Sequence, residues 1–257
     1  MTTSCFIGTS GFSYADWKGI FYPPEIKPAG NLAYYATRFN CIEINSCFYR
    51  IPRQSTIEKW TDSVPGDFKF CPKLYQGITH YRRFKNCEEL LENYFEAFSP
   101  MKSKLGPVLI QLPKSFAFQY DVVKAFFELL EKEYGEYRFA IETRHVSWYE
   151  EDALGLLSEY HIAHTISDAG AHHFPTHFAV TSDDIYLRFH GREQLYATDY
   201  KDVDLKVYAV LIKDWMKEGK RIFAFFNNTM HGYAINNALT LRTMVGEGAS
   251  GSGLIRP

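Results

Sequence analysis

The feature that most constrains the fold of this chain is a repeated alternation of short apolar runs with longer segments of helical periodicity. In the longer segments apolar residues recur three or four positions apart, which is the spacing of one face of an amphipathic helix. Strands that alternate with helices form right-handed β-α-β units and therefore a parallel sheet. The expected strands are residues 5–8, 41–45, 68–73, 108–112, 138–143, 163–167, 185–190 and 222–227. The expected helices are residues 31–39, 55–62, 86–104, 120–134, 150–160, 203–217 and 233–245.

Eight such strands in a chain of 257 residues predict an α/β fold of the (β/α)8 TIM-barrel type, in a single domain of residues 1–246. The connection between the sixth and seventh strands, residues 169–184, is irregular because it has no helical period, and residues 177–180 are a candidate for a small extra strand. Residues 247–257 are rich in Gly and Ser and are expected to form a flexible tail. Two helix starts are predicted from side chains, with Asn31 as an N-cap and with Ser55 and Glu58 as a capping box.

The composition is that of an ordinary globular protein. Hydrophobic residues make up 46% of the chain, and the net charge of −2 gives no general attraction to nucleic acid or acidic membranes. The five cysteines show no paired spacing, and Cys5, Cys41 and Cys71 lie in apolar runs, which predicts buried thiols in a reducing compartment. We find neither a signal-peptide pattern nor an apolar run of membrane-spanning length, so we expect a cytoplasmic protein with no membrane partner. The sequence does not predict an oligomeric state.

Polar residues follow the expected strands at their carboxyl ends. In a parallel barrel these ends meet at one face, and binding sites form there. The densest cluster follows the fifth strand, where Glu142, Arg144, His145 and Trp148 occur within seven positions. The other polar or aromatic residues at strand ends are Trp17, Glu43, Asn45, Tyr49, Lys73, His80, Gln111, Asp168, Arg188, His190, Asn227 and Asn228. Burying a polar group without a partner costs roughly 1–3 kcal/mol, so this recurrence predicts a functional site at that face.

Several of these residues lie in short motifs that follow one another in a fixed order. The motifs are Gly8-Thr9-Ser10-Gly11, Glu43-Ile44-Asn45 with Phe48-Tyr49, Lys73 with Ile78-Thr79-His80, Gln111-Leu112-Pro113, Glu142-Thr143-Arg144-His145 with Ser147-Trp148, Arg188-Phe189-His190-Gly191 and Phe226-Asn227-Asn228. Together they resemble the YecE-like family, domain of unknown function 72, over almost the whole chain. The resemblance implies a TIM barrel with a pocket and implies no reaction. Phe12 departs from the tryptophan that is usual in such proteins, although an aromatic ring is kept.

The residue types suggest both catalysis and anion binding. Glu142, His145 and Glu43 are the predicted acid/base catalysts. Lys73, Arg144 and Arg188 come from three strands and are predicted to bind a phosphate or carboxylate; the alternative is that they neutralise the carboxylates. The remaining residues of the set are predicted to bind the substrate. A ring of the ligand is expected to stack on Trp17, Tyr49 and Trp148. The predicted hydrogen-bonding groups are amides, histidines and one carboxylate: Asn45, Gln111, Asn227, Asn228, His80, His190 and Asp168.

A metal site is only weakly indicated. The carboxylates and histidines are of the types that bind Zn, Mn or Fe, but no HxxxH or HxH spacing is present. His172 and His173 are further candidate ligands, with an exposed loop as the alternative. Glycoside hydrolysis requires two suitably spaced carboxyl groups, and the fourth and seventh strands, which carry that pair in many barrel glycosidases, here provide Gln111 and Arg188.

The sequence therefore predicts an enzyme that acts by acid/base chemistry on an anionic, ring-bearing ligand. A phosphorylated sugar, a nucleotide or a nucleic-acid moiety has the required charge and ring, which suggests a hydrolase or lyase acting on a phosphate-containing substrate. Nucleic acid is a candidate partner if the site face carries a basic stripe. The cofactor is undetermined, and a divalent metal remains open. The alternative function is a non-catalytic ligand-binding or scaffold protein that uses the same pocket.

Overall fold

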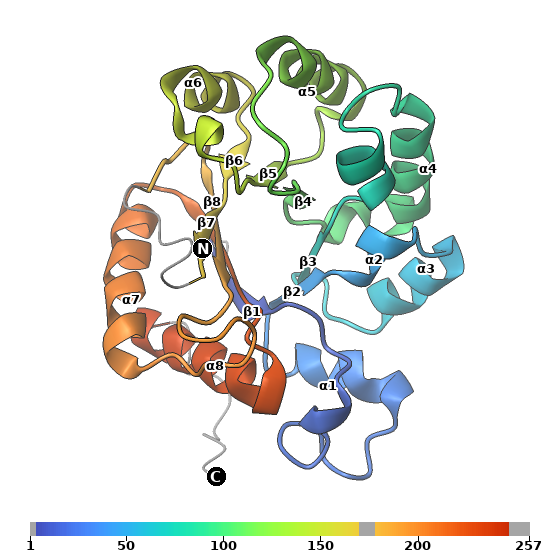
Figure 1. Ribbon diagram of the computed structural model, residues 1–257. Helices are drawn as coiled ribbons and strands as arrows, with labels where there is room; N and C mark the ends of the chain where they lie inside the picture. The colour runs from blue at the N-terminus through green and yellow to red at the C-terminus, as the bar shows by residue number, and fades with distance from the viewer. Residues whose placement is uncertain (1–3, 170–177, 247–257) are drawn as a thin grey trace.

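The computed structural model describes residues 4–169 and 178–246. The strands are β1 Cys5–Thr9, β2 Cys41–Ile44, β3 Lys69–Pro72, β4 Val108–Gln111, β5 Phe139–Glu142, β6 Ala163–His164, β7 Ile166–Asp168, β8 Asp184–Phe189 and β9 Arg221–Phe226. The helices are α1 Asn31–Ala36, α2 Ser46–Tyr49, α3 Gln54–Asp62, α4 Glu88–Phe98, α5 Tyr120–Tyr134, α6 Glu151–Glu159, α7 Asp202–Lys217 and α8 Tyr233–Val245. The strands lie in the middle of the molecule and the helices surround them in chain order (Figure 1).

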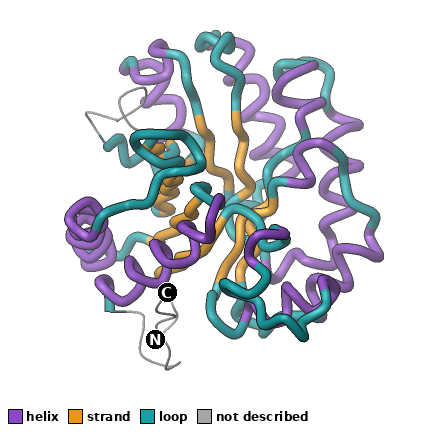
Figure 2. The backbone as a smooth tube through the Cα atoms, turned by 60° about the horizontal axis from the view of Figure 1, so that its bottom comes forward, coloured by secondary structure: helices purple, strands orange, loops and turns teal. Residues whose placement is uncertain are grey.

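All strand pairs are parallel, as the alternating pattern predicts. They form three sheets, with the orders β1-β9-β8-β7, β2-β3 and β4-β5-β6. Isolated bridges connect these sheets, because Ser10 pairs with Glu43 and Lys73 pairs with Leu109. Figure 2 shows the strands gathered inside the helices from a second direction. The α/β fold with parallel strands is thus confirmed, whereas the hydrogen-bonded sheets by themselves do not establish a closed barrel.

The expected strand at residues 163–167 is divided in two. Thr165 separates β6 from β7, and its backbone N–H donates to the carbonyl oxygen of Ile141 at 2.9 Å. Beside β6, the hydroxyl of Thr181 accepts from the N–H of His164 and donates to the carbonyl of Ile162. A side chain therefore supplies hydrogen bonds that a neighbouring strand would otherwise make. Residues 178–180 form no strand, and the other part of the expected extra strand lies outside the described residues.

Helix positions agree with the hydrophobic period, but the predicted caps are wrong. The helices expected at 120–134 and 233–245 have those bounds. Helix α1 has Gly30 at its N-cap and α3 has Arg53, and neither makes a side-chain cap hydrogen bond. Asn31 is instead the first residue of α1, so its side chain is past the capping position. The segment expected as one helix over 86–104 consists of α4 followed by a 3-10 helix, Ser99–Lys104.

The core has two layers because side chains on successive strand positions point to opposite faces. The larger layer packs strands against helices. The smaller one lies between the strands and consists of Phe6, Cys41, Cys71, Leu109, Ala140, Ala163, Tyr186, Phe223 and Phe225. The five cysteines are buried, as expected for Cys5, Cys41 and Cys71. Among the described residues, no helix combines the length and the hydropathy needed to span a membrane.

Candidate functional site

Three ionised side chains meet one layer above the small inner core. Glu43, Glu142 and Arg188 each lie two positions after an inner-core residue of the same strand, so the strand period turns them inward too. Arg188 binds Glu43 with both of its edge nitrogens, from Nε to Oε2 at 2.9 Å and from Nη2 to Oε1 at 2.8 Å. Its Nη1 donates to Oε2 of Glu142. All three side chains are at most 3% exposed, so β2, β5 and β8 share one buried ion cluster.

Glu43 has no free acceptor position. Its Oε1 also accepts from the hydroxyl of Ser10 at 2.7 Å and from Nδ2 of Asn45 at 3.0 Å, while its Oε2 accepts from the hydroxyl of Tyr186 at 3.0 Å. Burial alone would raise the pKa of Glu43, but the charge and hydrogen bonds of Arg188 outweigh it and lower the pKa. Glu43 is therefore a fully hydrogen-bonded carboxylate whose ionised form is favoured.

Glu142 is held in the ionised form in the same way. Besides Arg188, it is bound by Nη2 of Arg144 at 3.2 Å, and Nε2 of His190 lies 3.6 Å from its Oε1. Burial opposes ionisation, but Arg188, followed by His190 and Arg144, sets the pKa of Glu142 well below its usual value. The side chain of Arg144 is 27% exposed, so this guanidinium extends from the buried cluster towards solvent.

One ring nitrogen of His190 has a hydrogen-bond partner, and the other has none among the described residues. Its Nδ1 is 3.1 Å from Nδ2 of Asn227, and its buried Nε2 has no hydrogen-bond partner among the described residues, since the 3.6 Å separation from Glu142 is too long. An amide that donates to Nδ1 leaves the ring proton on Nε2. Burial lowers the pKa of His190, although Glu142 raises it in part, so the neutral ring is favoured. Oδ1 of Asn45 is a second buried polar atom in this region without a partner in the described chain.

Lys73 lies beside the cluster and forms no ion pair with another described residue. Its Nζ donates to Oε1 of Gln111 at 2.7 Å and lies 3.8 Å from the centre of the Phe48 ring. The ring of His80 packs edge-on against the same Phe48. Burial lowers the pKa of Lys73 to about 8, and the charge of Arg188 contributes in the same direction.

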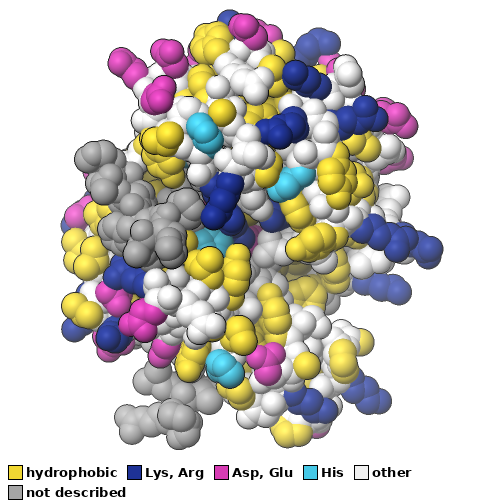
Figure 3. All heavy atoms as spheres, in the orientation of Figure 1, with side chains coloured by type: hydrophobic (Ala, Val, Ile, Leu, Met, Phe, Trp, Pro, Cys, Tyr) yellow, Lys and Arg dark blue, Asp and Glu magenta, His cyan; other side chains and the backbone are white. Residues whose placement is uncertain are grey.

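The cluster carries an excess of positive charge at its outer side. Arg188, Arg144 and Lys73 face two carboxylates, and Arg188 is the cation that both carboxylates share. Figure 3 shows Lys, Arg and His side chains near the centre of the face in view, with hydrophobic side chains around them. The excess charge and the unpartnered polar atoms fit an anionic ligand better than a cation.

Several predicted site residues have other roles. Trp17 and Trp148 are fully buried, and their Nε1 groups donate to backbone carbonyls of Thr229 and Phe116 at 2.9 Å. The prediction that they stack on a ligand is wrong, because neither ring has an accessible face. Tyr49 is 69% exposed and stays a candidate.

Asp168, Asn228 and His145 are each engaged elsewhere. Asp168 accepts from Arg192 at 2.9 Å and from the hydroxyl of Tyr208 at 2.7 Å. The amide of Asn228 is fully buried and donates to backbone and side-chain oxygens of the loop before α7 and of α8. His145 accepts with Nδ1 from the backbone N–H of Ser147 and so caps the short helix Val146–Tyr149. The structure therefore does not bring these three side chains into the ion cluster.

Ser10 and Tyr186 bind Glu43 and were not predicted as site residues. Tyr186 could have been predicted from the sequence, because it lies two positions before Arg188 on the same strand and hence on the same face. For a metal, no group of three His, Cys, Asp or Glu side chains in residues 4–169 and 178–246 is arranged to hold an ion. His172 and His173 lie outside the described residues.

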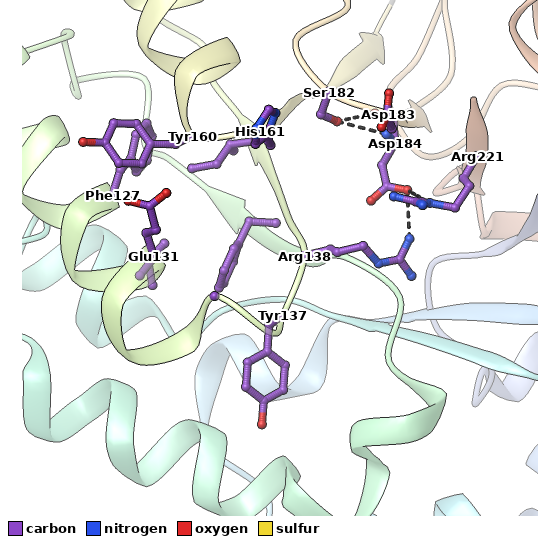
Figure 4. A pocket seen from close by; sticks show the side chains of 14 residues that line it. Phe127, Glu131, Tyr137, Arg138, Tyr160, His161, Ser182, Asp183, Asp184 and Arg221 are labelled. Carbon is purple, nitrogen blue, oxygen red and sulfur yellow. Dashed lines mark hydrogen bonds and ion pairs between the residues drawn. The ribbon is translucent and has the colours of Figure 1, made fainter. Parts of the chain in front are cut away.

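A cavity of about 240 Å³ lies at the opposite ends of the strands, where β5, β8 and β9 begin. Figure 4 shows Arg138 and Arg221 converging on one carboxylate, that of Asp184. Nη1 of Arg138 and Nε of Arg221 both donate to Oδ1 of Asp184, at 2.8 and 2.6 Å. In parallel α/β sheets ligands bind at the carboxyl ends of the strands, so we do not assign the site to this opposite end.

The family model described as "Protein of unknown function DUF72" matches residues 6–255. The chain belongs to this family. UPF0759 protein YunF of Bacillus subtilis is 27% identical over 90% of this chain and 91% of its own length. UPF0759 protein YecE of Escherichia coli K12 is 29% identical over 46% of this chain and 43% of its own.

Solved DUF72 structures share the fold. The protein from Thermotoga maritima MSB8 is 31% identical with a TM-score of 0.80, over 94% of this chain and 98% of that one. The protein from Enterococcus faecalis V583 has a TM-score of 0.81 at 22% identity, over 98% of both chains. The resemblance seen in the sequence motifs is thus confirmed. None of these names states a reaction or a ligand, so the function has to be argued from the site.

Proposed function

We propose that this DUF72 protein is an enzyme that binds a small phosphate- or carboxylate-bearing ligand at the carboxyl ends of its strands. The observation that carries the proposal is Lys73. Among the described residues no carboxylate lies within 4.0 Å of its Nζ, although the side chain is half-buried and is subject to the charges of Arg188 and Arg144. A half-buried ammonium without a counter-ion is disfavoured by its partial loss of hydration, and an anionic ligand would supply the missing charge.

Arg144 is the second anion-binding group in this proposal. Its contact with Glu142 uses one edge of the guanidinium, at 3.2 Å and 3.4 Å, and about a quarter of the side chain is exposed. A guanidinium can bind oxyanions with two parallel hydrogen bonds. Arg188, by contrast, donates with all three guanidinium nitrogens to Glu43 and Glu142, so we propose that it holds both carboxylates in position.

The proton-transfer role falls to His190 in place of Glu142 and Glu43. A carboxylate whose pKa lies below its usual range is a poor base at neutral pH, because the base strength falls with the pKa. His190 is neutral and carries its ring proton on Nε2, which faces Glu142, so it accepts a further proton at Nδ1 once the Asn227 amide releases that nitrogen. Glu142 would orient the imidazole and stabilise its protonated form. The exposed ring of Tyr49, which packs edge-on against the buried Phe48, supplies the ring-binding surface expected for a sugar or nucleotide.

The finer architecture is part of the same proposal. We infer that the three sheets close into one (β/α)8 barrel in which β6 and β7 together form a single strand. The isolated bridges between β1 and β2 and between β3 and β4 support this closure, and so does an inner core to which nearly every strand contributes. Closure places all carboxyl ends around one face, as the proposed site requires.

Calorimetric titration with inorganic phosphate and ribose 5-phosphate tests the binding. We expect both probes to bind, and we expect Lys73→Met and Arg144→Met each to weaken binding at least tenfold. Lys59→Met in α3 is the matched control, because Lys59 is exposed and lies on a helix outside the site. Absence of binding to the wild type, or equal loss in the control, would refute the anion site. Binding without turnover of any phosphorylated carbohydrate would favour the non-catalytic alternative.

A further inference from the structure

Lys73 is held in a fixed position by its neighbours. It directly follows β3, its backbone N–H donates to the carbonyl of Ile44 at 3.0 Å, and it bridges to Leu109 of β4. Its Nζ is directed by Oε1 of Gln111 at 2.7 Å. The other end of that amide donates to the carbonyl of Leu112 at 2.6 Å, which fixes which atom faces the lysine. The amine is therefore positioned as a reactive group would need to be.

The surroundings of Nζ increase the fraction of Lys73 present as the neutral amine. An amide oxygen and the Phe48 ring stabilise an ammonium less than a carboxylate does. The charged and titratable groups that act on it come from several strands and loops: Arg188, Arg144, Glu142, Glu43 and His80. With a pKa of about 8, roughly a quarter of the Lys73 amines are unprotonated at pH 7.5, against about one in a thousand for a lysine with an ordinary pKa near 10.4.

We propose that Lys73 is a covalent catalyst that forms an imine with an aldehyde or ketone group of the anionic ligand. This deepens the proposed function, on whose anion site it rests. The ligand class is then a carbonyl compound that also bears a phosphate or carboxylate, with Arg144 binding the anion while Lys73 attacks the carbonyl. A lysine that served only as a permanent cation would not need the oriented amide of Gln111.

The step balances without an external oxidant or reductant. The lone pair of Nζ attacks the carbonyl carbon, the C=O π electrons move to oxygen, and the oxygen takes up the proton that the nitrogen releases. The resulting carbinolamine loses its hydroxyl as water while the nitrogen lone pair forms the C=N bond. The proton for the leaving hydroxyl is carried by water or by His80, whose ring packs on the same Phe48 as Lys73.

Borohydride trapping tests the imine directly. The purified full chain is incubated with glycolaldehyde phosphate and sodium borohydride, and the site of the reduced adduct is mapped by peptide mass spectrometry. We expect one adduct per chain, on Lys73, with a labelling rate that rises with pH to a midpoint near 8. Exposed Lys59 is the internal control and should label at least tenfold more slowly. Labelling spread over surface lysines with Lys73 unmodified would overturn the proposal, and so would a Lys73 rate that rises only above pH 10.

Lys73→Arg separates this inference from the proposed anion site. The variant keeps the positive charge but forms no stable imine, so it should bind inorganic phosphate and show no adduct at this position. If wild type and variant both bind phosphate and neither is trapped, the imine is refuted while the anion site stands. If neither binds phosphate but neutral glycolaldehyde is trapped on wild-type Lys73, the amine is confirmed and the anion site fails.

Discussion

Replacing Arg188 by Met tests the energetic role of the buried ion cluster. The substitution removes the guanidinium that binds Glu43 twice and Glu142 once, and it leaves both carboxylates buried at 0% and 1% exposure. At an effective dielectric constant of 20, one ion pair at about 4 Å is worth roughly 4 kcal/mol. Removing one partner of a buried pair typically costs about 3–5 kcal/mol. Because Arg144 still pairs with Glu142, we expect a loss near the middle of that range.

Urea unfolding of wild type and Arg188→Met at several pH values measures this loss. In the wild type the pKa values of Glu43 and Glu142 are lowered, so their stabilising contribution is present above the unfolded pKa near 4.3 and is lost as the pH falls through the folded values. Without Arg188, burial raises the folded pKa values, so the destabilisation grows as the pH rises above about 4.3. The difference between the two proteins should therefore be largest at neutral pH and shrink towards pH 4.

The matched control replaces all three charges at once. Glu43→Gln and Glu142→Gln combined with Arg188→Met leave no unpaired charge, and this triple variant should recover at least half of the lost free energy of unfolding. A loss below about 1 kcal/mol in the single variant at pH 7 would refute the reasoning. A difference that does not change with pH would refute it as well, because uncompensated carboxylates must respond to protonation.

Three further substitutions probe packing and hydrogen bonding, each read by the free energy of unfolding. Gly8→Ala should cost about 1–3 kcal/mol, because its Cβ would lie 2.4 Å from the carbonyl oxygen of Cys41; a neutral effect would show that β1 and β2 separate easily. Trp148→Phe should cost about 1–3 kcal/mol, because it removes a hydrogen bond and side-chain volume, and phosphate binding should stay unchanged. Weakened phosphate binding would show that Trp148 contributes to the ligand site after all. Asp184→Asn should cost about 1–2 kcal/mol, because it leaves the positive charges of Arg138 and Arg221 facing each other. Salt screens this repulsion, so the loss of stability should be smaller at high salt, and a loss that does not depend on salt would contradict this account.

Strand positions and the location of the cluster were predictable because both depend on the period of two. The pattern that made residues 138–143 a strand also placed Glu142 on its inward face, and the same holds for Glu43 and Arg188. Polar residues on that face have few partners except one another. The alternation of side chains along each strand is therefore sufficient to place these three residues on one face.

The individual role of each residue in the cluster could not be predicted in the same way. Whether Arg188 binds a ligand or binds Glu43 depends on distances across the strands, which no local pattern contains. Trp17 and Trp148 follow strands just as ligand-binding rings do, and only their zero exposure shows that they are core. The split at Thr165 escaped prediction because the competing hydrogen bonds come from Thr181, a residue distant along the chain.

The sequence separation within the ion cluster has a consequence for synthesis of the protein. Arg188 lies 145 residues after Glu43 and 46 after Glu142, so a chain emerging from the ribosome presents both carboxylates long before their shared cation. Contacts of such long range form late, since the loop-closure entropy must first be overcome. Until β8 arrives, closing the inner layer would bury two unpaired acids, which disfavours premature compaction of the first strands. We therefore expect Arg188 also to delay the docking of the early strands until nearly three quarters of the chain has been synthesised.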